Sequence, residues 1–434
     1  MSAIWPVRKL REIASVRVSN VDKKAYPREN PVSLCNYMDV YANDYVTQKI
    51  EFMQATATAA EIERFGLAVG DVVITKDSET PDDIGIPTVI SDEIPGLVCG
   101  YHLAMIRPNL NELDSIYLAK QLSTSRVARY FSLQASGSTR YGLPISAIES
   151  VEIPIPPKPE QTKIAEILFT VDRAIEQTEA LIAKQQRIKT GLMQDLLTHG
   201  IGAGGNLRTE QTHEFKGSPL GRIPVEWEVA PLSNIVDLQV GYAFKSSSFI
   251  EEGMRLLRGE NVGTGKVDWK DSRFLPPATA EKHKQYALVS GDLIIGMDRT
   301  FTKQGCKVTL LTGDDVPCLL VQRVGRFVPL AVPRRFMQLL VQSPAYQREL
   351  FLQQKGMDIP HLSKGEILAP MVPIPNTQKE MSAIAEEAQK INITLLTNVG
   401  ALLKLCALKT ALMQDLLTGR KRVTALLADP PVPA

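Results

Sequence analysis

The chain has 434 residues, enough for two or three domains, and its 44% hydrophobic and 22% charged content is that of a folded globular protein. No apolar run approaches the roughly 18 residues that a membrane span needs, and the first residues contain no apolar signal core, so we expect a cytoplasmic protein. Five dispersed cysteines without a CxxC pair and five dispersed histidines exclude a disulfide framework and give no support for a metal site.

The first half begins with residues 1–158, which we expect to form a mixed α/β domain. GDVVITKD (70–77) predicts a glycine turn that leads into a β-branched strand, and 116–130 predicts a short helix. A loop, SGSTRYGL (136–143), and a proline-rich extended segment, EIPIPP (152–157), end this domain.

A long amphipathic helix is expected over residues 159–200, with Pro159 in its first turn, where a missing N–H costs nothing. Apolar residues recur at alternating spacings of four and three, which predicts a heptad seam for side-by-side helix packing. A second row at intervals of seven, which includes Leu181 and Ile188, widens this stripe. Residues 201–226 are rich in glycine and polar side chains and predict a linker.

The second half repeats this order, with a domain over 227–376, a helix over 377–420 and a C-terminal tail over 421–434. GDLIIGMD (291–298) predicts the corresponding turn and strand, and 336–352 predicts a short helix. Thr377 and Glu380 have the spacing of a capping box. The residues expected to pack the two long helices together are Ile164, Leu168, Val171, Ile175, Ile182, Leu192 and Leu196 in the first and Ile384, Ala388, Ile391, Leu395, Leu402, Leu412 and Leu416 in the second.

The chain is therefore a tandem repeat, and KTGLMQDLLTHG (189–200) returns as KTALMQDLLTGR (409–420). Two matched helices, each roughly 60 Å long at 1.5 Å per residue, bury both apolar stripes at once if they pair in antiparallel fashion. We accordingly predict an α+β fold in which two mixed α/β domains are separated by two long antiparallel coiled-coil helices related by a pseudo-two-fold axis.

This organisation resembles the specificity subunit of type I restriction-modification systems. The residues that carry the resemblance are EIPIPPKPEQTKIAEIL (152–168), the two LMQDLLT helix ends, IPVEWEVAPL (223–232) and SGSTRYGL (136–143). The second half departs from it, since QKGMDIPHL (354–362) stands where the first half has its GSTR loop.

The resemblance implies a non-catalytic subunit that binds double-stranded DNA and reads an asymmetric bipartite target, with one half-site for each domain. It also implies that the helices form a spacer and dock two methyltransferase subunits, which restriction subunits then join. The chain itself is expected to bind no cofactor, because S-adenosylmethionine, and ATP and Mg for restriction, would belong to those partners.

Candidate DNA-reading residues are long polar side chains on loops beside the two repeated strands, because Arg and Lys suit guanine, Asn suits adenine, and any cation can hold a phosphate. His102 is expected to pack beside Tyr101 instead. The candidates are Lys76, Ser78, Ser138, Thr139, Arg140 and Tyr141 in the first domain and Lys245, Arg258, Asn261, Arg299, Thr300 and Lys303 in the second.

The net charge of +1 does not by itself indicate DNA. Residues 1–158 hold 16 basic and 19 acidic residues, and residues 227–376 hold 18 and 15. Either the basic side chains gather on one face or partner subunits supply charge. No complete set of nucleophile, base and orienting group is found, but two alternatives stay open: a single-chain DNA methyltransferase or endonuclease, and a coiled-coil scaffold that binds no DNA.

Overall fold

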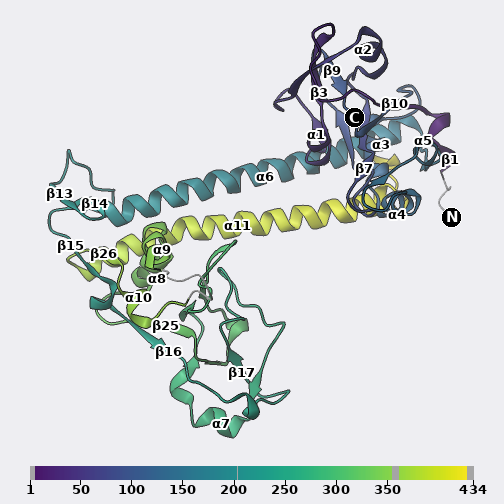
Figure 1. Ribbon diagram of the computed structural model, residues 1–434. Helices are drawn as coiled ribbons and strands as arrows, with labels where there is room; N and C mark the ends of the chain where they lie inside the picture. The colour runs from purple at the N-terminus through teal and green to yellow at the C-terminus, as the bar shows by residue number, and fades with distance from the viewer. Residues whose placement is uncertain (1–4, 203, 354–360, 428–434) are drawn as a thin grey trace, which may run out of the picture. The chain divides into compact units, whose positions relative to one another are not determined.

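The computed structural model describes residues 5–202, 204–353 and 361–427. The chain divides into two compact units, Met1–Glu179 with Gly400–Ala434, and Ala180–Val399. Each unit therefore combines one α/β domain with a part of each of the two long helices (Figure 1).

The first unit is built on a mixed sheet whose central strand is fully buried. Its strand order is β2 (Ala14–Val18), β10 (Leu103–Pro108), β6 (Val72–Thr75), β8 (Pro87–Ile90) and β4 (Tyr45–Val46). All neighbours are antiparallel except β4 and β8. All four residues of β6 are buried, which explains why its sequence is a continuous apolar run rather than an alternating one. Gly70, at φ +93°, makes the left-handed turn that leads into this strand.

Smaller elements surround this sheet. A second sheet has the order β5 (Met53–Ala57), β3 (Asn30–Cys35) and β9 (Leu97–Cys99), while β1 (Val7–Lys9) pairs with β12 (Glu152–Pro154) and β7 (Asp77–Ser78) with β11 (Tyr141–Gly142). The short helices are α1 (Tyr37–Tyr41), α2 (Ala59–Phe65), α3 (Ser115–Leu122), α4 (Ser125–Gln134) and α5 (Ile145–Glu149).

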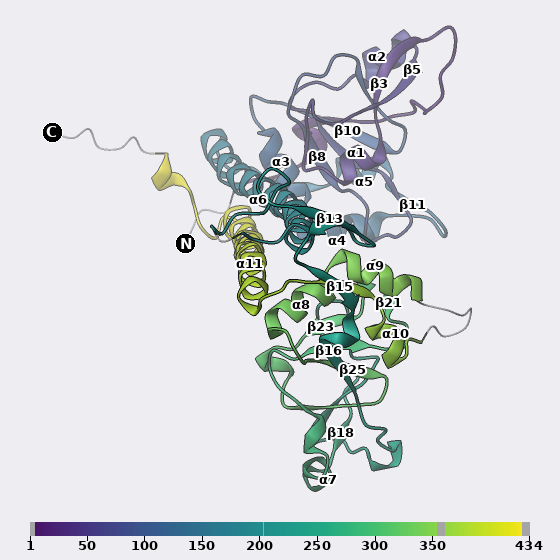
Figure 2. The same ribbon diagram turned by 90° about the vertical axis from the view of Figure 1, so that its left-hand side faces the viewer.

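The second unit repeats the plan. Its main sheet has the order β16 (Val236–Val240), β25 (Val324–Pro329), β20 (Leu293–Gly296) and β23 (Val308–Leu310). Of these strands, β16, β23 and β25 are labelled in Figure 2. A second sheet has the order β18 (Phe274–Leu275), β17 (Met254–Leu257), β24 (Cys318–Leu320) and β19 (Ala287–Leu288). Three further strand pairs are β13 (Phe215–Ser218) with β14 (Gly221–Pro224), β15 (Glu228–Pro231) with β26 (Met371–Ile374) and β21 (Phe301–Thr302) with β22 (Gly305–Cys306). The short helices are α7 (Pro277–Glu281), α8 (Arg334–Gln342), α9 (Pro344–Gln353) and α10 (Lys364–Leu368).

Three local expectations are corrected. The single helices expected over 116–130 and 336–352 are each two helices, α3 with α4 and α8 with α9. Ser123 and Thr124 separate the first pair. Ser343 separates the second, because Pro344 cannot continue α8 and instead occupies the first position of α9. The segment expected as a linker contains the β13–β14 hairpin, whose Ile223 is fully buried.

The two long helices are α6 (Lys158–Thr198) and α11 (Gln378–Leu416). In the first unit Lys409 of α11 contacts Asp172 of α6 at 2.7 Å, and in the second unit Asn398 donates a hydrogen bond to Gln185 at 2.8 Å. These contacts join early residues of one helix to late residues of the other, so the pairing is antiparallel. Every residue of the expected heptad seam is buried or half-buried.

The same tryptophan anchor occurs at the end of each helix pair. Trp227 is buried against Gly200 and donates its indole N–H to Glu380 at 3.2 Å. Trp5 lies against Gly419, at the end of the other helix. Gly200 and Gly419 both have positive φ and follow the ends of α6 and α11. A Cβ on Gly200 would lie 2.3 Å from the Trp227 ring, so glycine makes room for the indole there, whereas a Cβ on Gly419 would lie 3.4 Å from Trp5.

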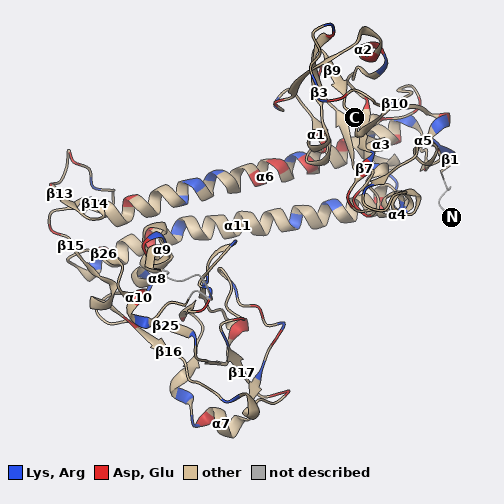
Figure 3. Cartoon of the chain, viewed as in Figure 1, with Lys and Arg blue, Asp and Glu red and all other residues tan. Residues whose placement is uncertain are grey.

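The expectation that no segment is apolar enough to span a membrane is wrong for α11, which meets the length and composition criteria among the described residues. Little of that window is buried within the chain. Residues 391–403 of α11 contain no charged side chain, as the long tan stretch in Figure 3 shows. In this stretch α11 therefore presents an apolar surface, most of which is not buried by the rest of the chain.

Candidate nucleic-acid interface

An aspartate follows the repeated buried strand of each domain, β6 or β20, and other polar side chains contact it. In the first domain Asp77 accepts hydrogen bonds from His102 at 2.7 Å and from Lys76 at 2.9 Å. Burial, the largest influence, raises the pKa of Asp77, but these two hydrogen bonds outweigh it and hold the pKa below its ordinary value. In the second domain Asp298 contacts His361 at 2.8 Å and Arg323 at 3.5 Å.

The structure brings the first-domain candidates together on one face. The pairing of β7 with β11 sets Tyr141 opposite Ser78 and Gly142 opposite Asp77. The loop with Ser138, Thr139 and Arg140 therefore continues from the Ser78 end of this strand pair, while at the other end Leu143 donates its backbone N–H to Lys76 O at 2.9 Å. All three loop residues are exposed, whereas Ser78 is buried.

The GSTR loop is a closed turn whose ends are held by reciprocal backbone hydrogen bonds between Ser136 and Gly142, at 3.1 and 3.0 Å. Gly137 has φ +151°, and a Cβ there would lie 2.0 Å from the carbonyl oxygen of Arg140. Only glycine fits this position, which explains why a glycine precedes the three exposed residues.

Sequence reasoning missed several polar side chains on this face. Tyr37 and Tyr41 of α1 stack with their ring centroids 5.5 Å apart, and Tyr41 donates a hydrogen bond to Asp83 at 3.0 Å. His102 lies against Tyr101 as expected, with ring centroids 3.6 Å apart, and it also pairs with Asp77. The matching octapeptides GDVVITKD and GDLIIGMD do align Asp77 with Asp298, so the repeat was the signal that could have found both aspartates.

The second-domain candidates divide by exposure. Lys245, Arg299 and Lys303 are exposed, and Lys303 lies between the two strands of the β21–β22 hairpin. Asn261 is buried and its amide is used internally, accepting from the Arg258 N–H and donating to Asp268 O. Thr300 is also buried, and its hydroxyl donates to Gly296 O at 2.8 Å.

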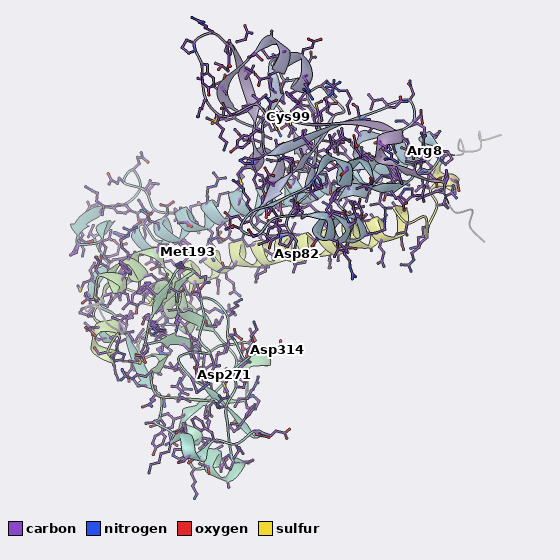
Figure 4. All side chains as sticks on the ribbon, turned by 45° about the vertical axis from the view of Figure 1, so that its right-hand side comes forward. Arg8, Asp82, Cys99, Met193, Asp271 and Asp314 are labelled. Carbon is purple, nitrogen blue, oxygen red and sulfur yellow. The ribbon has the colours of Figure 1, made fainter. Side chains whose placement is uncertain are left out.

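Arg258 is half-buried and paired with acids of its own domain. It contacts Asp271, labelled in Figure 4, at 3.2 Å, and it also contacts Glu260. Of the expected QKGMDIPHL segment, residues 354–360 lie outside the described residues.

An open depression of about 570 Å³ in the second domain joins several of these groups. It is lined by four basic residues, Arg258, Arg299, Lys307 and Arg323, against two acidic ones. Burial and the neighbouring Arg299 lower the pKa of Lys307. A concave surface with surplus positive charge favours an anionic ligand.

A larger cavity in the first unit, of about 700 Å³, has the opposite character. Three basic side chains line it against five acidic ones, Asp44, Asp92, Asp172, Glu176 and Glu179. Its surplus of negative charge is unsuited to a phosphate backbone. The described residues contain no group of three or more His, Cys, Asp and Glu side chains that could hold a metal ion.

The repeated sheets, the long paired helices and the polar face in each domain define a two-domain binding protein built as a tandem repeat. Residues 4–185 match the family model for the type I restriction modification DNA specificity domain. The chain is 31% identical over 316 residues to the type I restriction enzyme MjaVIII specificity subunit of Methanocaldococcus jannaschii, which covers 72% of each protein. It is also 31% identical over 175 residues to the EcoAI specificity subunit of Escherichia coli, covering 39% of this chain and 30% of that one.

The chain therefore belongs to the specificity subunits of type I restriction enzymes, as its sequence motifs indicated. A crystal structure of the S subunit from M. genitalium matches 96% of this chain and 97% of that one, with a TM-score of 0.59 at 15% identity, which confirms the predicted fold class. Members of the family are non-catalytic subunits that bind DNA within larger complexes. The alternative of a single-chain methyltransferase or endonuclease is accordingly excluded.

Proposed function

We propose that this chain reads an asymmetric bipartite DNA sequence, with one half-site for each α/β domain. The observation that carries the proposal is that the same strand and aspartate recur in both domains, while the side chains around the aspartate differ. Both domains place an aspartate after the same central strand, but the side chains around Asp77 and Asp298 differ. Two readers on one frame with different side chains would select two different half-sites.

The domain boundaries that we propose are those expected from the sequence: recognition domains over 1–158 and 227–376, helices over 159–200 and 377–420, a connection over 201–226 and a tail over 421–434. The reading faces would include the half-buried Lys76 and the exposed candidates Ser138, Thr139, Arg140, Lys245, Arg299 and Lys303. The buried Ser78, Asn261 and Thr300 would hold these faces in shape, because their polar groups are engaged within the domain or shielded from solvent.

The long helices would dock methyltransferase subunits, two in number because the frame is repeated. On α11, Ile393, Leu396 and Leu403 fall on one face by their spacing, and all are exposed. On α6, Leu181 and Ile188 are exposed as well. Exposed apolar rows of this kind are typical of protein interfaces. A solved type I system whose description concerns complex assembly has the same fold, with a TM-score of 0.53, 14% identity and 96% coverage of this chain.

Restriction subunits would join the methylating complex, S-adenosylmethionine would bind the methyltransferase subunits, and ATP and Mg would serve restriction. The complex would act in the cytoplasm, where the DNA is. The scaffold alternative predicts that the domains bind no DNA.

The deciding experiment is selection from a pool of random duplex DNA by the complex of this chain with its methyltransferase subunits. We expect enrichment of one split sequence with two unlike halves. Replacing residues 1–158 with the domain of another family member should change one half only. A pool that stays unselected would favour the scaffold alternative, and a change in both halves would refute the modular reading.

A further inference from the structure

The surroundings of Asp77 and Asp298 can be compared position by position, because the strands beside them have the same register. Thr75 of β6 pairs with Leu103 of β10, and Gly296 of β20 pairs with Val324 of β25. The aspartates lie two residues after Thr75 and Gly296, and the residues just before β10 and β25 are His102 and Arg323.

The side chains around the aspartate differ between the two domains. Where the first domain has Ser78, the second has Arg299, and where the first has His102, the second has Arg323. Opposite the aspartate, the antiparallel partner is Gly142 in the first domain and His361 in the second. The carboxylate is thus kept while the groups that surround it are exchanged.

Both arginines have a backbone conformation that side chains disfavour. Arg299 has φ +46° and Arg323 has φ +66°, and they are the only non-glycine residues with positive φ in the described part of the chain. Residues held in this region persist only where their surroundings impose it, and they concentrate at functional sites. Here both line the same basic depression.

The surrounding structure imposes these conformations on both arginines. Met297 donates its backbone N–H to Arg323 O at 2.9 Å, which ties the two segments together. The fully buried Thr300 follows Arg299, and its backbone carbonyl accepts from Lys307 at 2.7 Å. The directions in which the two side chains leave the backbone are therefore fixed by the fold.

The two guanidinium groups have different partners. Arg323 contacts Asp298 at 3.5 Å, and the same oxygen of Asp298 accepts from His361 at 2.8 Å. Arg299 is exposed, and its guanidinium has no hydrogen bond or ion pair with any residue that the structure describes. Lys307, by contrast, directs its ammonium to the backbone oxygens of Gly259 and Asp298.

We propose that Arg299 and Arg323 are specificity-determining residues of the second domain, each reading a guanine in the half-site, and that Asp298 is the positioning residue for Arg323. An arginine fork matches O6 and N7 of guanine in the major groove. A contact with phosphate alone would require neither a constrained backbone conformation nor a carboxylate that orients the guanidinium. The nearby Lys303 can supply such a phosphate contact. Because Ser78 and His102 replace these arginines, the first domain reads a different sequence. This inference rests on the proposed function.

The test uses the complex of the full chain with its methyltransferase subunits and a pool of random duplex DNA. Arg299→Lys and Arg323→Lys keep the charge but remove the planar fork. For each variant, we expect the preference for guanine at one base pair of the second half-site to fall about tenfold or more, because a bidentate pair discriminates by roughly that factor. The first half-site should be unchanged. Arg335→Lys, at an exposed position of α8, is the matched control and should leave both halves unchanged.

Asp298→Asn tests the positioning role by the same readout. We expect weaker guanine preference at the base pair assigned to Arg323 and unchanged preference at the one assigned to Arg299. A merely structural role would lower thermal stability without changing either preference.

Two results would overturn the inference while leaving the proposed function intact. One is an equal loss of affinity for every sequence in both lysine variants, which marks phosphate contacts. The other is an unchanged second half-site. If the unmodified complex selects no split sequence, the proposed function fails first, so the two failures are distinguishable.

Discussion

At the scale of single residues, a buried cluster of ion pairs links the first domain to α6 and α11. Asp172 of α6, with its side chain 6% exposed, contacts Lys120 of α3 and Lys409 of α11, each at 2.7 Å, and accepts from Tyr45 at 2.7 Å. Asp44 contacts the same two lysines at 2.9 Å. In the second repeat, Asn392 occupies the position of Asp172, and Lys189 occupies the position of Lys409. Because the central carboxylate is replaced by an amide there, this cluster of ion pairs is specific to the first unit.

Removing the central charge should be costly. We expect Asp172→Asn to lower the free energy of unfolding of the first unit by about 3–5 kcal/mol, because it leaves buried Lys120 without its buried partner. Chemical denaturation followed by hydrogen exchange in residues 1–179 measures this. Glu166→Gln, in an exposed pair with Lys163 on the same helix, is the control and should change stability by less than about 1 kcal/mol. Equal effects of the two changes would contradict a buried network.

The same cluster makes stability depend on pH. Burial, the largest influence, opposes ionisation of Asp44, but Lys120 and Lys409 lower its pKa from 3.8 to about 2. A depressed pKa in the folded state stabilises the protein above the unfolded pKa, and this contribution is lost as the pH falls through the folded value. Because the side chain of Asp44 is 51% exposed, solvent reduces the contribution to about 1 kcal/mol.

We therefore expect the stability difference between the unmodified chain and Asp44→Asn to be constant above about pH 4.5 and to vanish towards pH 2. Denaturant midpoints measured at intervals of pH test this. A difference that grew as the pH fell would contradict the assignment.

At the scale of elements, α6 and α11 each have two apolar faces. The heptad residues of one face are buried or half-buried, and the apolar residues of the other face are exposed to solvent. Leu396 of α11 is 71% exposed, although it lies next to buried Leu395. We expect Leu396→Glu to weaken co-purification with the methyltransferase subunit at least tenfold, because a charge would enter an apolar interface, with little change in the melting temperature of the chain alone. Thr394→Glu, at an exposed position on another side of the helix, is the matched control. Retained assembly in Leu396→Glu would place the docking surface elsewhere.

At the scale of the whole molecule, the two ends of the sequence build one unit. Leu416, Leu417 and Val423 belong to the hydrophobic core of the first domain together with Trp5 and Leu10. Gln121 donates to Leu417 O at 2.9 Å, and Arg422 pairs with fully buried Glu160.

Deletion of residues 400–434 should therefore unfold residues 1–179, although these are far away in sequence, and leave residues 180–399 protected. Hydrogen exchange resolved along the chain tests this outcome. Uniform protection of residues 1–179 in the shortened chain would show that the first domain is independent of the C-terminal segment.

Several features followed from local pattern and could be predicted. The repeat, the two long helices and the buried strands β6 and β20 are each encoded in consecutive residues, as a heptad row or an apolar run after a glycine turn. The family motifs placed the chain among the specificity subunits for the same reason, since EIPIPPKPEQTKIAEIL and LMQDLLT are contiguous.

The candidate site depended on pairings between distant segments. The sequence by itself proposed Lys76, Ser78 and the GSTR loop, but only the β7–β11 pairing places them side by side. It proposed Asn261 as a reader, and the fold turns that amide inward to backbone groups. Asp298, Arg323 and His361 come from three segments separated by up to 63 residues, so no local spacing could join them.

The sequence by itself thus determined the element types, the repeat and the family, because helical periodicity and strand burial are written in neighbouring residues. The tertiary structure decided which polar groups are exposed, which pair with an aspartate, and that the C-terminal segment completes the first domain. These outcomes depend on strand register and on contacts across more than 200 residues of sequence, such as that between Arg422 and Glu160, which local propensities do not encode.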